Sequence, residues 1–198
     1  MTKFDTVRKN LEANGFAVTC FATKEEACDY LNQKLDGRTI GFGGSITLKE
    51  MGLYDTLSTH NETHWHWVDG PTECPAAATA QVYFSSVNGL AETGEIVNID
   101  GNCNRISATM YGHDELYLVV GKNKLAGDYD AALWRARNVA APKNAQRMSC
   151  KTPCAVNGDK CYDCKSPARI CRALTVLWRK PKGLQHAEVV LIDEELGY

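Results

Sequence analysis

Short apolar runs typical of buried strands alternate along this chain with segments that have the periodicity of amphipathic helices. Strands are expected at residues 16–21, 39–42, 81–85, 95–100, 116–121, 174–178 and 188–192. Helices are expected at residues 2–14, 23–34, 45–53 and 128–140. This alternation predicts an α/β fold, a sheet covered by helices, in which ligands bind beyond the carboxyl ends of the strands.

The length and composition indicate one folded domain. The chain has 198 residues, of which 44% are hydrophobic and 23% are charged, as expected for a globular protein. It contains no internal repeat or linker, so we expect a single domain over residues 1–198. Within this domain, residues 150–171 are rich in cysteine and are expected to form an insertion before the last two strands.

The N-terminal residues lack an apolar core of signal-peptide length, and no apolar run approaches the ~20 residues needed to span a bilayer. The sequence therefore predicts a cytoplasmic protein without a membrane span. Nine cysteines in a cytoplasmic chain favour metal or redox chemistry over structural disulfides.

The charge is unevenly distributed, although the net charge is only -2. Between Lys143 and Lys182 there are ten Lys or Arg residues and two acids. Such a tract can bind nucleic acid, and it can also offset the charge of thiolates at a metal site. Because the basic residues are interleaved with cysteines, we favour the second interpretation and expect no nucleic-acid partner.

Four cysteines have the spacing C-x6-C-x2-C-x6-C and are the candidate metal ligands: Cys154, Cys161, Cys164 and Cys171. Four thiolates suit either zinc or an iron–sulfur cluster. We expect a cluster, most simply [4Fe–4S], with zinc as the alternative, because the spacing does not separate the two. Cys150 is left open as a spare ligand or a resolving thiol.

A glycine turn follows the strand expected at residues 39–42 and precedes a helix. Gly43 and Gly44 would let a ligand approach the backbone, while Ser45 and Thr47 add hydroxyl groups. The motif lacks the lysine of a P-loop, so a simple packing turn is an equal alternative.

Two further segments are polar enough to orient a small molecule. Residues 85–105 are crowded with Asn, Asp, Ser and Gly, and include Asn88, Asn104 and Arg105. The same composition also makes ordinary turns, including a hairpin turn at residues 92–95 between the strands expected at 81–85 and 95–100. Lys122 and Lys124 follow a buried-type strand, and from the residues alone we favour a solvated position for both.

Several motifs in order resemble the lactate-utilisation (LUD) domain family. They lie at residues 41–53, 88–92, 96–105, 119–124, 137–145, 151–154 and 161–171. The resemblance covers essentially the whole chain, and it implies the NagB/RpiA/CoA-transferase-like fold. It also implies a link to the oxidation of L-lactate to pyruvate by an iron–sulfur multiprotein system. This chain is similar to short members of the family that carry their own cysteines.

Within this resemblance, three residues are the catalytic candidates: Glu50 as an acid or base, Asp100, and Arg105, whose fork suits a carboxylate. The candidate ligand-binding residues are Gly43, Gly44, Ser45, Thr47, Asn88, Asn104, Lys122 and Lys124.

The sequence therefore predicts an iron–sulfur protein that acts in the oxidation of L-lactate or a related small anionic acid, with an electron-transfer protein as partner. One alternative is a non-catalytic assembly or regulatory protein with structural zinc. Another, by fold analogy, is a transferase or isomerase that binds a CoA or phosphate ester. A homo-oligomer is left open.

Overall fold

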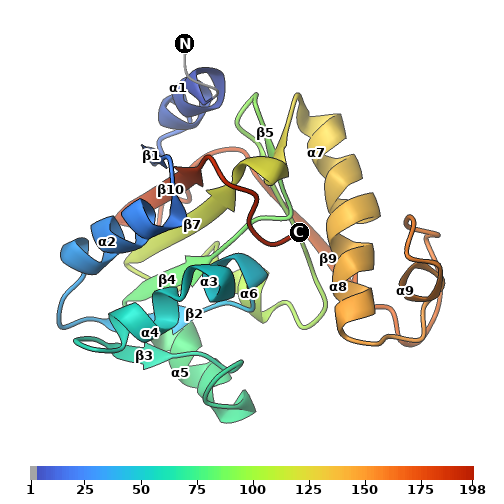
Figure 1. Cartoon of the computed structure of the whole chain (residues 1–198), viewed down its shortest axis with the longest axis horizontal. Coiled ribbons are helices and arrows are strands. Elements are labelled where there is room, and N and C mark those ends of the chain that lie inside the picture. Colours follow the sequence, from blue (N-terminus) through green and yellow to red (C-terminus); the bar gives the residue numbers. More distant parts are fainter. Residues whose placement is uncertain (1–3) are drawn as a thin grey trace.

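The computed structural model describes residues 4–198, so the start of the helix expected at 2–14 lies outside the described part. The core is a six-stranded, entirely parallel sheet in the order β1-β10-β7-β4-β2-β3 (Figure 1). Its strands are β1 (Ala17–Phe21), β2 (Thr39–Phe42), β3 (Glu62–His64), β4 (Val82–Ser85), β7 (Glu115–Gly121) and β10 (His186–Ile192). The expected α/β fold is confirmed.

Both faces of this sheet are buried, which is why its central strands read as continuous apolar runs. Along β7, Leu116 and Leu118 belong to one hydrophobic cluster, together with residues of α1 (Asp5–Ala13). Tyr117 and Val119 point to the opposite face and belong to a second cluster. That cluster includes residues of α2 (Lys24–Lys34), α3 (Ile46–Met51) and α4 (Leu53–Leu57).

A second, four-stranded sheet has the order β8-β5-β6-β9. Its strands are β5 (Gly89–Ala91), β6 (Ile96–Asp100), β8 (Leu125–Ala126) and β9 (Ala173–Leu177). The hairpin turn at residues 92–95 therefore joins β5 to β6. The expectation that it joins the strand at 81–85, which is β4, to β6 was wrong, because β4 pairs with β7 in the other sheet. The strand β5 was missed because three residues are too few to show an alternating pattern.

One long helical segment covers the second sheet (Figure 1). It consists of α7 (Tyr129–Arg135), a π-helical stretch (Ala136–Ala140) and α8 (Ala141–Arg147). The helix expected at 128–140 thus continues past its expected end and through Pro142. Proline is tolerated here because it lies at the first positions of α8. The hydrogen-bond register changes there from π-helical to α-helical, so no backbone N–H is needed from Pro142.

The remaining helices are short: α5 (Cys74–Thr79), α6 (Asn104–Ala108) and α9 (Pro153–Asn157), with 3-10 turns at Pro71–Glu73 and Lys122–Lys124. The cysteine-rich residues 150–171 contain α9 and irregular backbone between α8 and β9. From residue 4 onward, no helix is long and apolar enough to cross a membrane.

Candidate ligand-binding cavity

A cavity of about 540 Å³ opens where the segments after β2, β4 and β7 meet, at the carboxyl ends of the parallel strands. This is the position that the alternation of strands and helices predicted. The candidate ligand-binding residues that line it are Gly44, Ser45, Asn88, Asn104 and Lys124. Two of the catalytic candidates, Asp100 and Arg105, also line it. The structure therefore brings most of the candidate residues together.

The glycine turn after β2 makes room for neighbouring side chains. The Gly43 N–H donates to the Phe84 carbonyl at 2.8 Å, and a Cβ at this position would lie 2.9 Å from the Tyr83 hydroxyl. A Cβ at Gly44 would lie 2.9 Å from the Trp67 ring. Ser45 is the N-cap of α3, at the start of the helix expected from residue 45. The close packing of side chains thus accounts for both glycines.

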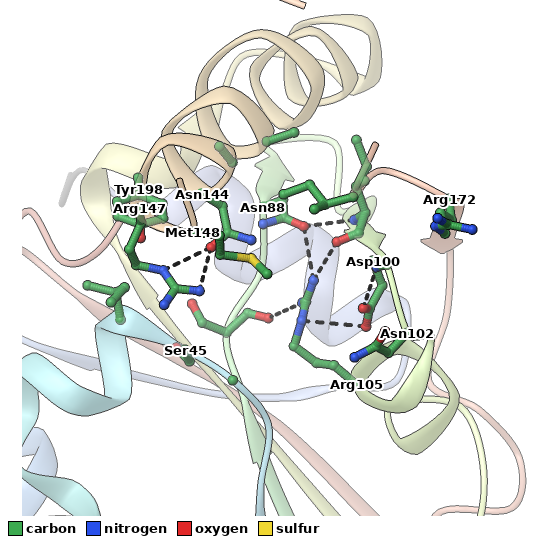
Figure 2. Close-up of a pocket in the computed structure, with 18 of the residues that line it drawn as sticks. Ser45, Asn88, Asp100, Asn102, Arg105, Asn144, Arg147, Met148, Arg172 and Tyr198 are labelled. Carbon is green, nitrogen blue, oxygen red and sulfur yellow. Dashed lines mark hydrogen bonds and ion pairs between the residues drawn. The ribbon is translucent and has the colours of Figure 1, made fainter. Parts of the chain in front are cut away.

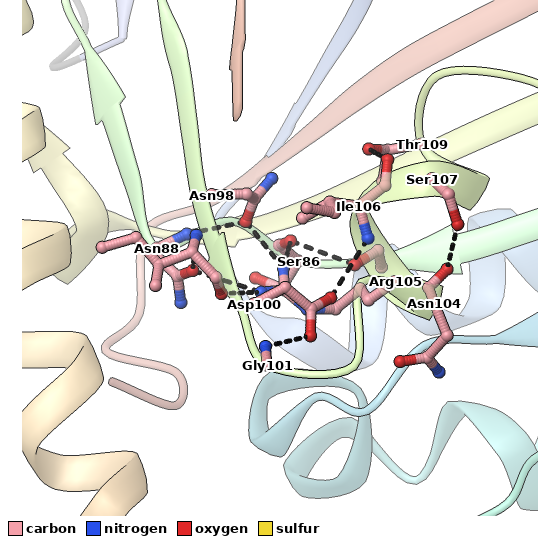
Figure 3. Close-up of polar contacts among 12 residues, drawn as sticks. Ser86, Asn88, Asn98, Asp100, Gly101, Asn104, Arg105, Ile106, Ser107 and Thr109 are labelled. Atoms are coloured by element: carbon pink, nitrogen blue, oxygen red, sulfur yellow. Dashed lines mark hydrogen bonds and ion pairs between the residues drawn. The ribbon is translucent and has the colours of Figure 1, made fainter. Parts of the chain in front are cut away.

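The guanidinium of Arg105 is held by protein acceptors (Figure 3). Its Nη1 donates to Asn98 Oδ1 at 2.7 Å, and its Nη2 donates to the Ile99 carbonyl at 2.6 Å and to Asn88 Oδ1 at 3.2 Å. Burial lowers the pKa of Arg105, and the nearby Asp100 opposes this effect. From the sequence we expected the Arg105 guanidinium to bind a substrate carboxylate. In the structure it connects β6 to the loop after β4.

The carboxylate of Asp100 is also committed to the protein backbone. Its two oxygens accept hydrogen bonds from the N–H groups of Gly101, at 2.6 Å, and Ile106, at 3.2 Å. The second bond ties Asp100 to α6. The distance between Arg105 Nε and Asp100 Oδ2 is 3.9 Å, and both residues line the cavity.

Lys124 is buried at the cavity, in contrast to the solvated position favoured from the residues alone. Only 3% of the residue is exposed, and its Nζ donates to Thr47 Oγ1 at 2.8 Å and to Ser86 Oγ at 2.9 Å. Burial lowers its pKa to about 7, and the cations Arg135 and Arg105 add to this effect. Thr47 thus holds Lys124 and does not line the cavity itself.

Glu50 and Lys122 do not line the cavity. Glu50 accepts a hydrogen bond from the Gly197 N–H at 2.7 Å and so holds the segment after β10. Lys122 forms an ion pair of 3.1 Å with Asp193 on the protein surface.

The sequence missed the cavity wall formed by α8. Arg147 lies over the Trp67 ring at 4.6 Å and donates two hydrogen bonds to Asn144 (Figure 2). Tyr198, from the segment after β10, lies beside them. Asn144 and Arg147 are three residues apart and share a helix face, but this signal is usable only if the helix is known to continue past 140.

The cysteine-rich segment forms another part of the wall, through residues 167–170 and Arg172. The Arg172 N–H donates to the Asp100 carbonyl at 2.9 Å. A Cβ at Gly101 would lie 2.7 Å from the Ile170 carbonyl, so glycine permits this close approach. The segment between Cys164 and β9 is therefore attached directly to the candidate site.

The four candidate metal ligands are half-buried. Among residues 4–198, no three His, Cys, Asp or Glu side chains are grouped closely enough to hold a metal ion. The local surroundings nevertheless suit a thiolate: the Asp163 N–H donates to Cys161 Sγ at 3.3 Å, and Arg137 Nη2 lies 4.0 Å from the same sulfur. The metal site stays a prediction.

The fold and the cavity define an α/β protein with a candidate site at the carboxyl edge of a parallel sheet. A family model described as the LUD domain matches residues 4–192. The chain therefore belongs to the LUD domain family, which is associated with lactate utilisation. The resemblance drawn from the motifs is confirmed.

A crystal structure of a DUF162 family protein from Deinococcus radiodurans is similar to this one, with a TM-score of 0.56 and 94% of each chain covered. The two sequences are 12% identical, so the likeness concerns the fold. No curated protein matches this chain.

Proposed function

We propose that this protein binds L-lactate or a related small organic acid in the cavity and takes part in its oxidation. Supporting this, five cationic side chains and one carboxylate line the cavity: Arg105, Lys124, Arg147, Arg169 and Arg172 against Asp100. Such an excess of positive charge in a partly enclosed site attracts an anion. Because Arg105 is occupied by protein acceptors, Lys124 and Arg147 are the residues we assign to the acid.

The oxidation requires an electron acceptor, and we propose a [4Fe–4S] cluster on Cys154, Cys161, Cys164 and Cys171. When bound, such a cluster supplies one-electron transfer. Two arginines next to the cysteines, Arg137 and Arg169, would offset the thiolate charge; Arg169 donates to the carbonyls of Cys164 and Cys171, both at 2.8 Å. Because the sulfurs are not grouped, metal binding would be coupled to local folding of this segment.

The observation that carries the proposal is the shared wall: residues 167–170 lie between two of the cysteines and line the cavity. A cluster in this segment would therefore lie near the bound acid.

Iron analysis tests the metal assignment. Protein purified without oxygen should contain about four iron atoms and as many sulfides per chain. Cys161→Ser should remove most of the iron. Cys20→Ser, which changes an exposed cysteine on β1, is the matched control and should retain it. Stoichiometric zinc without iron would support the alternative of a structural zinc site and contradict the redox proposal.

Calorimetric titration tests the acid site. Lys124→Met should weaken the binding of L-lactate about 10- to 100-fold, because it removes a charge-assisted hydrogen bond from a buried site. Lys122→Met removes the same charge two residues away and outside the cavity, so its affinity should match the wild type. Equal affinities for all three proteins would contradict the assignment.

A second candidate function follows from the size of the cavity. A volume of about 540 Å³ is in the range that holds drug-sized ligands and exceeds the need of a three-carbon acid. It favours a CoA or phosphate ester as the alternative ligand. The same titration distinguishes the two, since tighter binding of coenzyme A than of L-lactate would favour the ester.

A further inference from the structure

We propose that Lys124 is a nucleophile that forms an imine with the carbonyl group of a 2-oxo acid in the cavity. This inference rests on the proposed function, because oxidation of a 2-hydroxy acid places a carbonyl carbon in the same cavity. It adds a covalent step at a residue that so far has only a binding role.

The two hydroxyl groups that contact Lys124 determine whether its N–H groups or its lone pair can reach a ligand. Thr47 donates its own proton to the Leu196 carbonyl at 3.2 Å, and Ser86 donates its proton to the Val119 carbonyl at 2.5 Å. Both hydroxyl oxygens can therefore only accept from Lys124. These two hydrogen bonds use both N–H groups of a neutral amine and leave its lone pair unengaged. Because the side chain lines the cavity, a ligand there can meet the lone pair.

The charges around Lys124 favour the neutral, nucleophilic form. Three charged side chains from different elements act on it: Arg135 of α7, Arg105 of α6 and Glu50 of α3. The two arginines lower its pKa and Glu50 raises it, while burial is the largest effect. None of the ion pairs found among the described residues involves Lys124. Because the pKa is lowered from 10.5 to about 7, the neutral amine is much more populated near pH 7 than in an ordinary lysine.

The reaction is balanced without any further reagent. The amine lone pair attacks the carbonyl carbon, a C–N bond forms, and the carbonyl oxygen takes the proton lost by nitrogen. The resulting carbinolamine loses this oxygen as water, and a C=N bond replaces the C–O bond. One amine and one 2-oxo acid thus give one imine and one water. Arg147 lines the same cavity and is the residue we assign to the carboxylate.

Reductive trapping tests the proposal. The full-length protein is incubated with pyruvate and sodium cyanoborohydride, which delivers hydride to an imine, and the product is identified by intact mass and peptide mapping. We expect one reduced adduct on Lys124 whose rate of formation rises as the pH increases through 7. Lys124→Met should abolish this adduct, whereas Lys122→Met should keep it.

Two outcomes would overturn the inference: no adduct, or labelling spread over surface lysines to the same extent in both variants. Lys124→Arg serves as a second variant, since it keeps the positive charge and cannot form this imine. Titration of each protein with L-lactate, which has no carbonyl to trap, separates the two proposals. Lactate binding without an adduct refutes the imine alone, while absence of lactate binding refutes the proposed function.

Discussion

Replacement of Arg105 by methionine should lower the free energy of unfolding by about 3–5 kcal/mol, because it removes the hydrogen bonds that this guanidinium donates to Asn98, Ile99 and Asn88. The Asn98 Oδ1 and the Ile99 carbonyl each accept a short hydrogen bond from this guanidinium, and Asn98 is 1% exposed. Arg105→Lys should recover little of the loss, since one ammonium cannot reproduce a fork that reaches several acceptors. Urea denaturation measures both effects.

Arg147→Met is the matched control for Arg105. Arg147 is an exposed residue that donates hydrogen bonds to Asn144 in its own helix and lies over the Trp67 ring. Its replacement should change stability little and weaken the binding of L-lactate. The two variants therefore separate positioning from ligand contact. If Arg105→Met kept wild-type stability and lost only acid binding, Arg105 would be a direct carboxylate ligand, as the sequence suggested.

The main sheet was readable from the sequence because its strands are buried on both faces and are bounded by turns or capped helices. The helix start at residue 24 is an example, because Thr23 and Glu26 form a capping box there. A cavity does lie at the strand ends, where the sequence led us to expect a ligand, because parallel strands bring their carboxyl ends to one edge.

The roles of individual side chains were not readable, because they depend on contacts between distant segments. Lys122 and Lys124 cannot be told apart in the sequence, and one 3-10 turn contains both. In the structure Lys122 pairs with Asp193 at the surface, whereas Lys124 is buried and donates to Thr47 and Ser86. The cysteine-rich segment read as an appendage. Its contact with the cavity depends on the hydrogen bond between the Arg172 N–H and the Asp100 carbonyl. No local sequence pattern predicts a bond between residues so far apart in the chain.

The second large effect is expected at Glu188, a carboxylate that is 1% exposed and lies far from the cavity, on β10. It accepts hydrogen bonds from Thr19, Tyr30, Lys34 and His186. The Lys34 ammonium is 2.6 Å away. Glu188→Gln should cost about 3 kcal/mol of unfolding free energy, at the lower end for a broken buried pair because Lys34 keeps 31% of its side chain in solvent.

The loss should depend on pH in a defined direction. Burial opposes ionisation of Glu188, but the hydrogen bonds from Lys34, His186 and Thr19 outweigh it, so its pKa lies below the ordinary value of 4.5. A group with a lowered pKa in the folded state stabilises the protein above its unfolded pKa, and this contribution disappears as the pH falls through the folded value. The difference in stability between wild type and Glu188→Gln should therefore be full at neutral pH and shrink below 4.5.

Glu12→Gln provides the control, because it makes the same chemical change in an exposed ion pair. Glu12 lies 2.8 Å from Arg8, and both side chains are about half exposed, so the change should have almost no effect at any pH. Denaturation of the three proteins at several pH values gives the comparison. A Glu188→Gln difference that stayed constant below pH 4.5 would show that its cost comes from packing and not from the charge.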